Sequence, residues 1–137
     1  IADQLMAVLP ETQFIDIKDA KNYDAIVKVY NAGIMIGDGA LHFNPTETVT
    51  EKQLAYALYR LAGHKKSASY QTVKKWCTDK KIFNPGKDAS ATVTKAQVAK
   101  ALKAYAKYAG VKNPYSSTSK STLTRDDLAG ILVKYIK

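Results

Sequence analysis

The sequence contains very few of the side chains that form disulfides, metal sites or thiol active sites: one cysteine and two histidines in 137 residues. Because Cys77 has no second cysteine as a partner, an internal disulfide is excluded and the fold must rest on packing. His42 and His64 have no spacing that pairs them with Cys77 or with each other, so neither a zinc site nor a cysteine nucleophile is predicted. We expect Cys77 to be a buried, unreactive core residue.

Long apolar runs are missing as well. No stretch approaches the roughly 20 apolar residues of a transmembrane helix, so the sequence predicts no membrane insertion. Residues 1–6 lack the basic start and apolar core of a signal peptide, and any export signal is expected to lie outside this sequence. With 46% hydrophobic and 24% charged residues, the composition is that of a globular protein. The length suits one compact domain.

Catalytic motifs are equally scarce. The sequence has no pair of carboxylates in a shared motif, no Ser/His/Asp arrangement and no glycine loop of the kind that holds phosphates. The glycines within 37–39 predict a turn, and Asp38 lacks the spaced acidic neighbours of a calcium loop. Asp16 is interpreted as a turn or cap residue. The sequence therefore predicts a protein that is not an enzyme and that needs no metal ion or cofactor.

Acidic side chains become rare in the second half of the chain. Residues 1–66 carry 7 basic and 8 acidic side chains, whereas residues 67–137 carry 14 basic and 4 acidic ones. This asymmetry indicates either a polyanionic partner (a nucleic acid, an anionic lipid surface or an acidic wall polymer) or a solvated lysine face. Lys100, Lys103 and Lys107 recur on one side of a predicted helix without any nucleic-acid-binding motif, so we do not expect nucleic acid as the partner.

A short internal repeat is the strongest pattern in the sequence. A threonine, a valine or leucine and a second threonine occur at 48–50, 92–94 and 122–124. After the second threonine, apolar residues recur at positions +4, +5, +8 and +11, the spacing of the buried stripe of a helix. The stripe residues are Leu54, Ala55, Leu58 and Leu61, then Val98, Ala99, Leu102 and Tyr105, then Leu128, Ala129, Leu132 and Tyr135.

Each repeat also predicts where its helix begins. The second threonine is followed three residues later by a side chain that can complete a capping box with it. The pairs are Thr50 with Gln53, Thr94 with Gln97 and, in a looser form, Thr124 with Asp127. The first two helices are expected to end at Gly63 and Gly110, where the chain can turn left-handed.

A second amphipathic segment precedes two of these helices, at 22–30 and at 70–77, and each is followed by a loop rich in glycine, asparagine and proline. Before the third helix, residues 111–121 are short and polar and predict a linker. Segment Asp3–Leu9 can supply the missing helix by packing against the C-terminal one, or it is the tail of an earlier repeat. We divide this single domain, 1–137, into an N-terminal helix at 1–13, repeat 1 at 14–66, repeat 2 at 67–110 and a partial repeat 3 at 111–137.

Several short motifs in repeat 1 resemble the S-layer-homology repeats of bacterial surface proteins. Residues 14–17 (Phe-Ile-Asp-Ile) are similar to the opening of such a repeat. Its first helix and glycine turn are similar to Ala25-Ile26, Ala32-Gly33-Ile34 and Gly37-Asp38-Gly39. Phe43-Asn44-Pro45, followed by Val49-Thr50, is similar to the approach to its threonine-capped second helix. The resemblance covers residues 14–110, with 122–137 as half a repeat.

The resemblance implies an all-α fold in which helix-loop-helix repeats pack as a bundle about a pseudo-threefold axis. In this family, grooves between neighbouring repeats bind an anionic secondary cell-wall polysaccharide, often ending in pyruvylated sugars. The expected function is therefore a non-catalytic anchor for a secreted protein at the Gram-positive cell surface. The alternative is a degenerate scaffold of the same fold that contacts another protein within a surface assembly.

The resemblance also implies candidate ligand residues. The second helix of the family opens with Thr-Arg-Ala-Glu, and the arginine contacts the acid; here Arg125 keeps that residue, while Lys95 and Glu51 replace it. An anion is favoured at a helix start, but Glu51 would repel it, so we expect at most two working grooves, near Arg125 and near Lys95. Lys81 replaces the glycine that ends the first helix and is a further candidate.

Two aromatic residues complete the candidate site. Trp76 either stacks on a sugar ring or lies in the core beside Val73 and Cys77, and its position within the helix favours the core. Tyr70 lies near a segment boundary, where it can face a groove.

Overall fold

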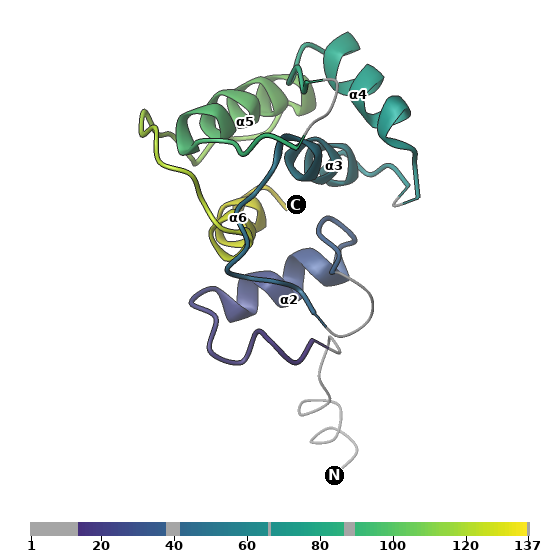
Figure 1. Ribbon diagram of the computed structural model, residues 1–137. Helices are drawn as coiled ribbons and strands as arrows, with labels where there is room; N and C mark the ends of the chain where they lie inside the picture. Colours follow the sequence, from purple (N-terminus) through teal and green to yellow (C-terminus); the bar gives the residue numbers. More distant parts are fainter. Residues whose placement is uncertain (1–13, 38–41, 66, 87–89, 137) are drawn as a thin grey trace.

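The computed structural model describes residues 14–37, 42–65, 67–86 and 90–136. The described residues form helices joined by loops, with isolated β-bridges and no strand, so the all-α prediction is confirmed. The helices are α2 (Tyr23–Asn31), α3 (Glu51–Leu61), α4 (Tyr70–Asp79), α5 (Lys95–Ala109) and α6 (Arg125–Leu132), followed by the short 3-10 helix η1 (Val133–Tyr135) (Figure 1). The helix expected within 1–13 lies outside the described residues.

All three predicted helix starts are capping boxes. In each, the threonine hydroxyl accepts from the N–H three residues later, and that residue's side chain accepts from the threonine N–H. The Thr124–Asp127 pair, expected in a looser form, is as complete as the other two. Gly110 ends α5 with φ of +69°, and Gly63 follows α3 with φ of +96°. The predicted boundaries of these helices are therefore confirmed.

The predicted stripe lies in the core. Its members at +4, +5 and +8 are buried in all three capped helices, as are Tyr105 and Tyr135 at +11, while Leu61 is half-buried. Cys77 is buried with Ala55 and Val73 in a small separate cluster. Burial raises the pKa of the Cys77 thiol to about 12, so the group is a protonated thiol at neutral pH, as expected for a core cysteine.

The three Thr-x-Thr segments pair with one another in cyclic order. The second threonine of each segment bridges the first threonine of the next, in the pairs Thr50–Thr92, Thr94–Thr122 and Thr124–Thr48. The residue after each second threonine donates its N–H to the carbonyl of the residue just before the paired segment. We call each junction between two paired segments a seam. These bonds run from Glu51 to Ala91 O (2.9 Å), from Lys95 to Ser121 O (2.8 Å) and from Arg125 to Glu47 O (2.9 Å). Each of the three segments is therefore paired with both of the others, and together they form a closed ring.

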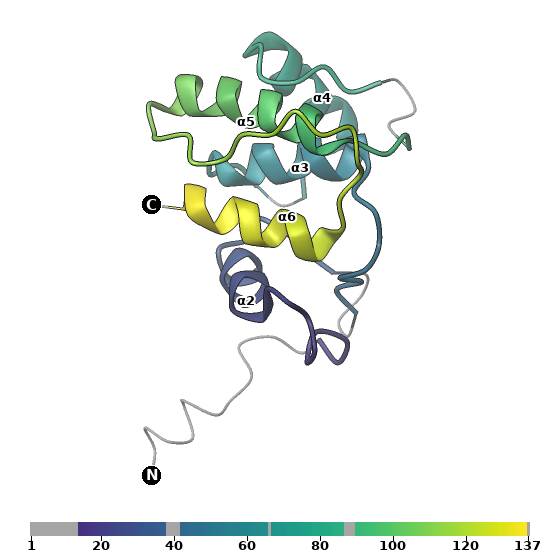
Figure 2. The same cartoon turned by 90° about the vertical axis from the view of Figure 1, so that its left-hand side faces the viewer.

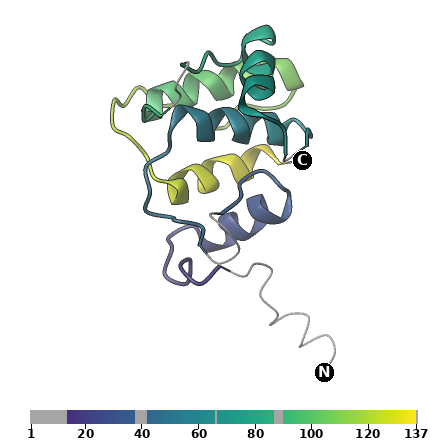
Figure 3. The same cartoon turned by 45° about the vertical axis from the view of Figure 1, so that its right-hand side comes forward.

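The helices follow the order of this ring. The first helix of repeat 1, α2, packs against α6, and the first helix of repeat 2, α4, packs against α3. Helix α6 lies between α2 and α3 in each view (Figures 1, 2 and 3). Beside α5, residues 111–121 run as extended chain and accept from the N–H groups of Lys95 and Ala96. An extended segment thus takes the place at α5 that a helix takes at α3 and α6.

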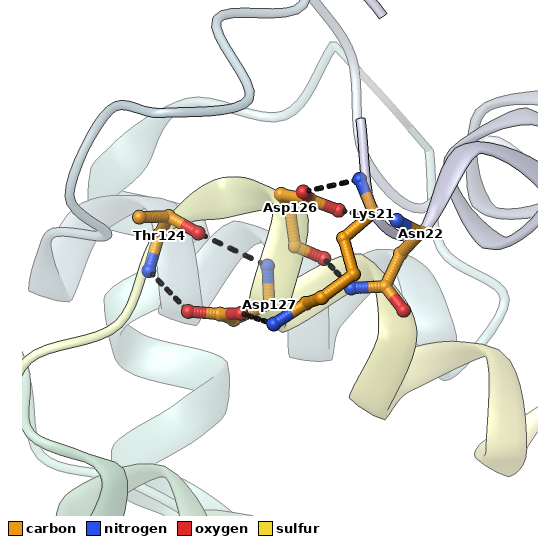
Figure 4. Close-up of polar contacts among 5 residues, drawn as sticks. All are labelled: Lys21, Asn22, Thr124, Asp126 and Asp127. Carbon is orange, nitrogen blue, oxygen red and sulfur yellow. Dashed lines mark hydrogen bonds and ion pairs between the residues drawn. The ribbon is translucent and has the colours of Figure 1, made fainter. Parts of the chain in front are cut away.

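Helix α6 also supplies the cap for the N-terminal end of α2 (Figure 4). The Asn22 side chain does not cap its own helix. Instead, the Asp126 carboxylate accepts from the N–H groups of Lys21 (3.0 Å) and Asn22 (2.9 Å), and an acid at this end also suits the helix dipole. Gly130 permits the close approach, because a Cβ there would lie 2.6 Å from the Asn22 side-chain oxygen. This contact joins the start of α2 to α6.

Candidate functional site

A cavity of about 460 Å³ lies between the first residue of α6, one side of α3 and the loop that follows α2. We call it the arginine groove. Its charged lining consists of three cations, Lys52, Arg60 and Arg125, and one carboxylate, Glu47. Residues 34–37 contribute an apolar wall. The excess of positive charge in a partly enclosed space predicts an anionic ligand.

Arg125 is only 7% exposed and is built into the floor of this groove. Its Nε donates to Phe43 O at 2.8 Å, its Nη2 donates to Ile36 O, and its guanidinium stacks over the Phe43 ring at 4.5 Å. Within the described residues it forms no ion pair. Burial lowers its pKa; Glu47 opposes that shift, and Arg60 adds to it. Arg125 therefore orders the loop and carries a buried positive charge, and Glu47 and Asp16 are the acids that oppose the lowering of its pKa.

Arg60 supplies the second guanidinium, from the last turn of α3. Its guanidinium lies 4.7 Å from the centre of the Tyr56 ring, and burial lowers its pKa. Arg60 was not among the predicted ligand residues, although Gln53, Tyr56 and Arg60 have the spacing of one helix face beside the buried stripe. All three line the arginine groove.

A second cavity, of about 430 Å³, has the equivalent position in repeat 2. Its cations are Lys81 and Lys100, and Gln97 lines it as Gln53 lines the arginine groove. At this seam the position of Arg125 is taken by Glu51, whose Oε1 accepts from the Gly86 N–H at 2.7 Å. The second cavity therefore has its positive charge from repeat 2 itself and not from the helix start of the neighbouring repeat.

Lys81 also keeps the backbone conformation of the glycine that it replaces. Its φ is +58°, against +78° for Gly33 after α2. The hydrogen bonds agree, because the two residues after Lys81 donate to Cys77 O as the two residues after Gly33 donate to Val29 O. The left-handed conformation is unfavourable for a residue with a Cβ, so Lys81 is a strained position.

We expect Lys81→Gly to raise the free energy of unfolding by about 1 kcal/mol, because glycine has no Cβ to strain. For a chain of this size that is a rise of about 4 °C in Tm, measurable by thermal denaturation. Lys80→Gly is the matched control, since Lys80 is right-handed with φ of −86°, and it should lower Tm. A neutral or lowered Tm for Lys81→Gly would show that contacts of the lysine side chain outweigh the backbone strain.

The five predicted ligand residues do not form one site. Arg125 lines the arginine groove and Lys81 lines the second cavity, while Lys95 is half-buried at the start of α5 and lines neither. Trp76 is half-buried, in an aromatic cluster described below. The Tyr70 hydroxyl donates to Gly86 O at 2.8 Å, and its ring lies 5.8 Å from the Lys52 ammonium. Lys95 stays a prediction for the seam between repeats 2 and 3.

No family model, curated protein or solved structure matches this chain. In the described ranges, no helix combines the length and the hydropathy that crossing a membrane requires. Across the same ranges, His, Cys, Asp and Glu side chains do not gather in groups of three or more that can hold a metal ion.

Proposed function

We propose that the chain is a non-catalytic module that anchors a secreted protein to the bacterial cell wall by binding an anionic secondary cell-wall polysaccharide. The observation that carries this proposal is the charge of the arginine groove, three cations against one carboxylate. An acidic sugar presents a carboxylate, and a guanidinium can bind a carboxylate through two parallel hydrogen bonds.

The cyclic pairing of the Thr-x-Thr segments supports the architecture that we propose for this function, S-layer-homology-like repeats about a pseudo-threefold axis. In that arrangement each groove lies at a seam between neighbouring repeats. The first residue of the capped helix differs at each seam: Arg125, Glu51 and Lys95. Only Arg125 offers a forked donor, so the arginine groove is the principal site.

The direct experiment is cosedimentation of the protein with Gram-positive wall sacculi, before and after acid extraction of the secondary polymer. We expect the protein to pellet with intact sacculi and to stay in solution with extracted ones. Equal binding to both preparations would contradict the proposal, because peptidoglycan alone would then be sufficient.

Arg60→Ala is expected to weaken binding to intact sacculi about ten-fold, the effect of losing one charge-assisted hydrogen-bonding group. Arg60 is the better first variant than Arg125, because Arg125 also holds the loop in place. Lys103→Ala is the matched control, since Lys103 is exposed on α5 and lines neither groove. If both variants bind equally well, general surface charge and not the groove decides binding.

One observation favours the alternative function, a scaffold for contact with another surface protein. Two of the five N–H donors of Arg125 are already bonded to carbonyls of its own chain, so the residue has a structural role with or without a ligand. If the protein is a scaffold, Arg60→Ala should leave its function unchanged. The protein should then bind intact and extracted sacculi equally weakly.

A further inference from the structure

A third cavity, of about 600 Å³, adjoins the arginine groove at the end of α3. We call it the tyrosine cleft, after Tyr105, Tyr108 and Tyr135 in its lining. Ile34 and Arg60 line both cavities, so Arg60 marks their junction. Together they follow α3 from Thr50 to Gly63, a length of about 20 Å at the rise of an α-helix. That length accommodates several sugar rings in a row.

The chemistry of the tyrosine cleft differs from that of the arginine groove. Among its lining residues Arg60 alone carries a charge, and the others are aliphatic or aromatic. Tyr105 and Tyr135 are 4% exposed and form the floor. Their hydroxyls are held in place: Tyr105 donates to Leu61 O at 3.3 Å, and Tyr135 accepts from the N–H of Tyr115 at 3.1 Å. Both floor hydroxyls are thus already bonded within the protein.

Tyr108 forms the exposed side of the cleft. It is 45% exposed, and its ring meets the Trp76 ring edge-on with centroids 5.6 Å apart. Trp76 in turn contacts Tyr59 and His64, whose rings stack at 4.5 Å. Tyr108 therefore extends into solvent from an aromatic cluster that supports it.

We propose that the tyrosine cleft is a second subsite, which binds the neutral sugar units that follow the acidic unit in the arginine groove. The apolar C–H face of a pyranose ring can pack on the face of a tyrosine ring. The sugar hydroxyls can form hydrogen bonds with the tyrosine hydroxyl and with water. The two cavities share Ile34 and Arg60 in their linings, so sugar units bound in each would be neighbours on one polymer. This inference rests on the proposed function. It adds that the polymer runs from the arginine groove past Arg60 into the tyrosine cleft.

Isothermal titration calorimetry with two probes tests it: the methyl glycoside of a pyruvylated hexose, and a trisaccharide ending in the same acidic unit. The trisaccharide should bind the wild-type protein about ten-fold more tightly than the single unit, the worth of one to two aromatic contacts. Tyr108→Ala should remove that gain and leave the affinity for the single unit unchanged. Arg60→Ala should weaken both probes. Tyr23→Ala is the control, because Tyr23 is 42% exposed on α2 and lines neither cavity.

The outcomes separate the two proposals. If the trisaccharide binds no more tightly than the single unit, or if Tyr108→Ala leaves the gain intact, the subsite is wrong while the anionic site stands. A Tyr108 face that serves a protein partner instead would give this result. If the wild-type protein binds neither probe, the proposed function fails and the subsite fails with it.

Discussion

Arg125→Ala is expected to lower the free energy of unfolding by about 3 kcal/mol and to abolish binding at the arginine groove. The substitution removes the donors to Phe43 O and Ile36 O, and an unsatisfied buried polar group costs about 1–3 kcal/mol. It also removes the cation that lies 4.5 Å from the Phe43 ring, a contact of about 1 kcal/mol. Urea denaturation followed by circular dichroism measures the change.

Lys95→Ala is the matched control, because Lys95 has the same position in α5 that Arg125 has in α6. Lys95 is half-buried and forms no ion pair with any described carboxylate, so its loss should cost less than about 0.5 kcal/mol. Arg125→Lys separates charge from geometry, since lysine keeps the charge but lacks the fork that reaches two carbonyls. Equal, small effects of Arg125→Ala and Lys95→Ala would contradict the structural role of Arg125.

The helices and the core could be predicted from the sequence because their signals are local. A capping box needs only a threonine and a glutamine three residues apart, and Thr50 and Gln53 form one wherever the helix packs. The buried stripe is likewise a property of one helix, and Leu54 and Leu58 are fully buried as predicted. Repetition of these signals at a fixed register made the prediction strong.

The interior of the candidate site could not be predicted, because its partners are far apart in the sequence. A position at the start of α6 predicts that Arg125 lies near a groove, but not that its side chain turns inward to carbonyls 82 and 89 residues away. The same reason applies to Arg60, which was not predicted as a site residue. A single arginine on an amphipathic helix is normally solvated, and only the loop at 34–37 makes it part of a cavity.

Lys81 was predicted in part: the sequence indicated it as a site residue but not its backbone conformation. Position 81 holds a lysine where the resemblance implies the glycine that ends the first helix of the repeat. The structure keeps the turn, with φ of +58°, and places the lysine in a cavity with Lys100. The backbone requirement of the fold is thus stronger than the preference of one residue, and the strain is local.

A chain that ends at Lys120, and so lacks the third Thr-x-Thr segment and α6, is expected not to fold at all. The missing segment is bonded to both of the others, through the Thr124–Thr48 and Thr94–Thr122 bridges. It also contributes buried side chains worth about 2–5 kcal/mol for each large one, against a total stability of about 5–15 kcal/mol. The lost core residues are Leu123, Leu128, Ala129, Leu132 and Tyr135. Circular dichroism should show little helix and no cooperative thermal transition.

The truncation distinguishes a closed ring from a linear stack of repeats. In a linear stack each repeat contacts only its neighbours, so losing a terminal unit removes one interface and leaves the rest folded. In a ring, the last segment holds the first: Asp126 caps α2, and Arg125 orders the loop that follows it. A chain ending at Leu132, which keeps α6, is the control and should unfold cooperatively at a lower temperature. A chain ending at Lys120 that melts cooperatively would show that repeats 1 and 2 are a stable pair and that the ring is not needed for the fold.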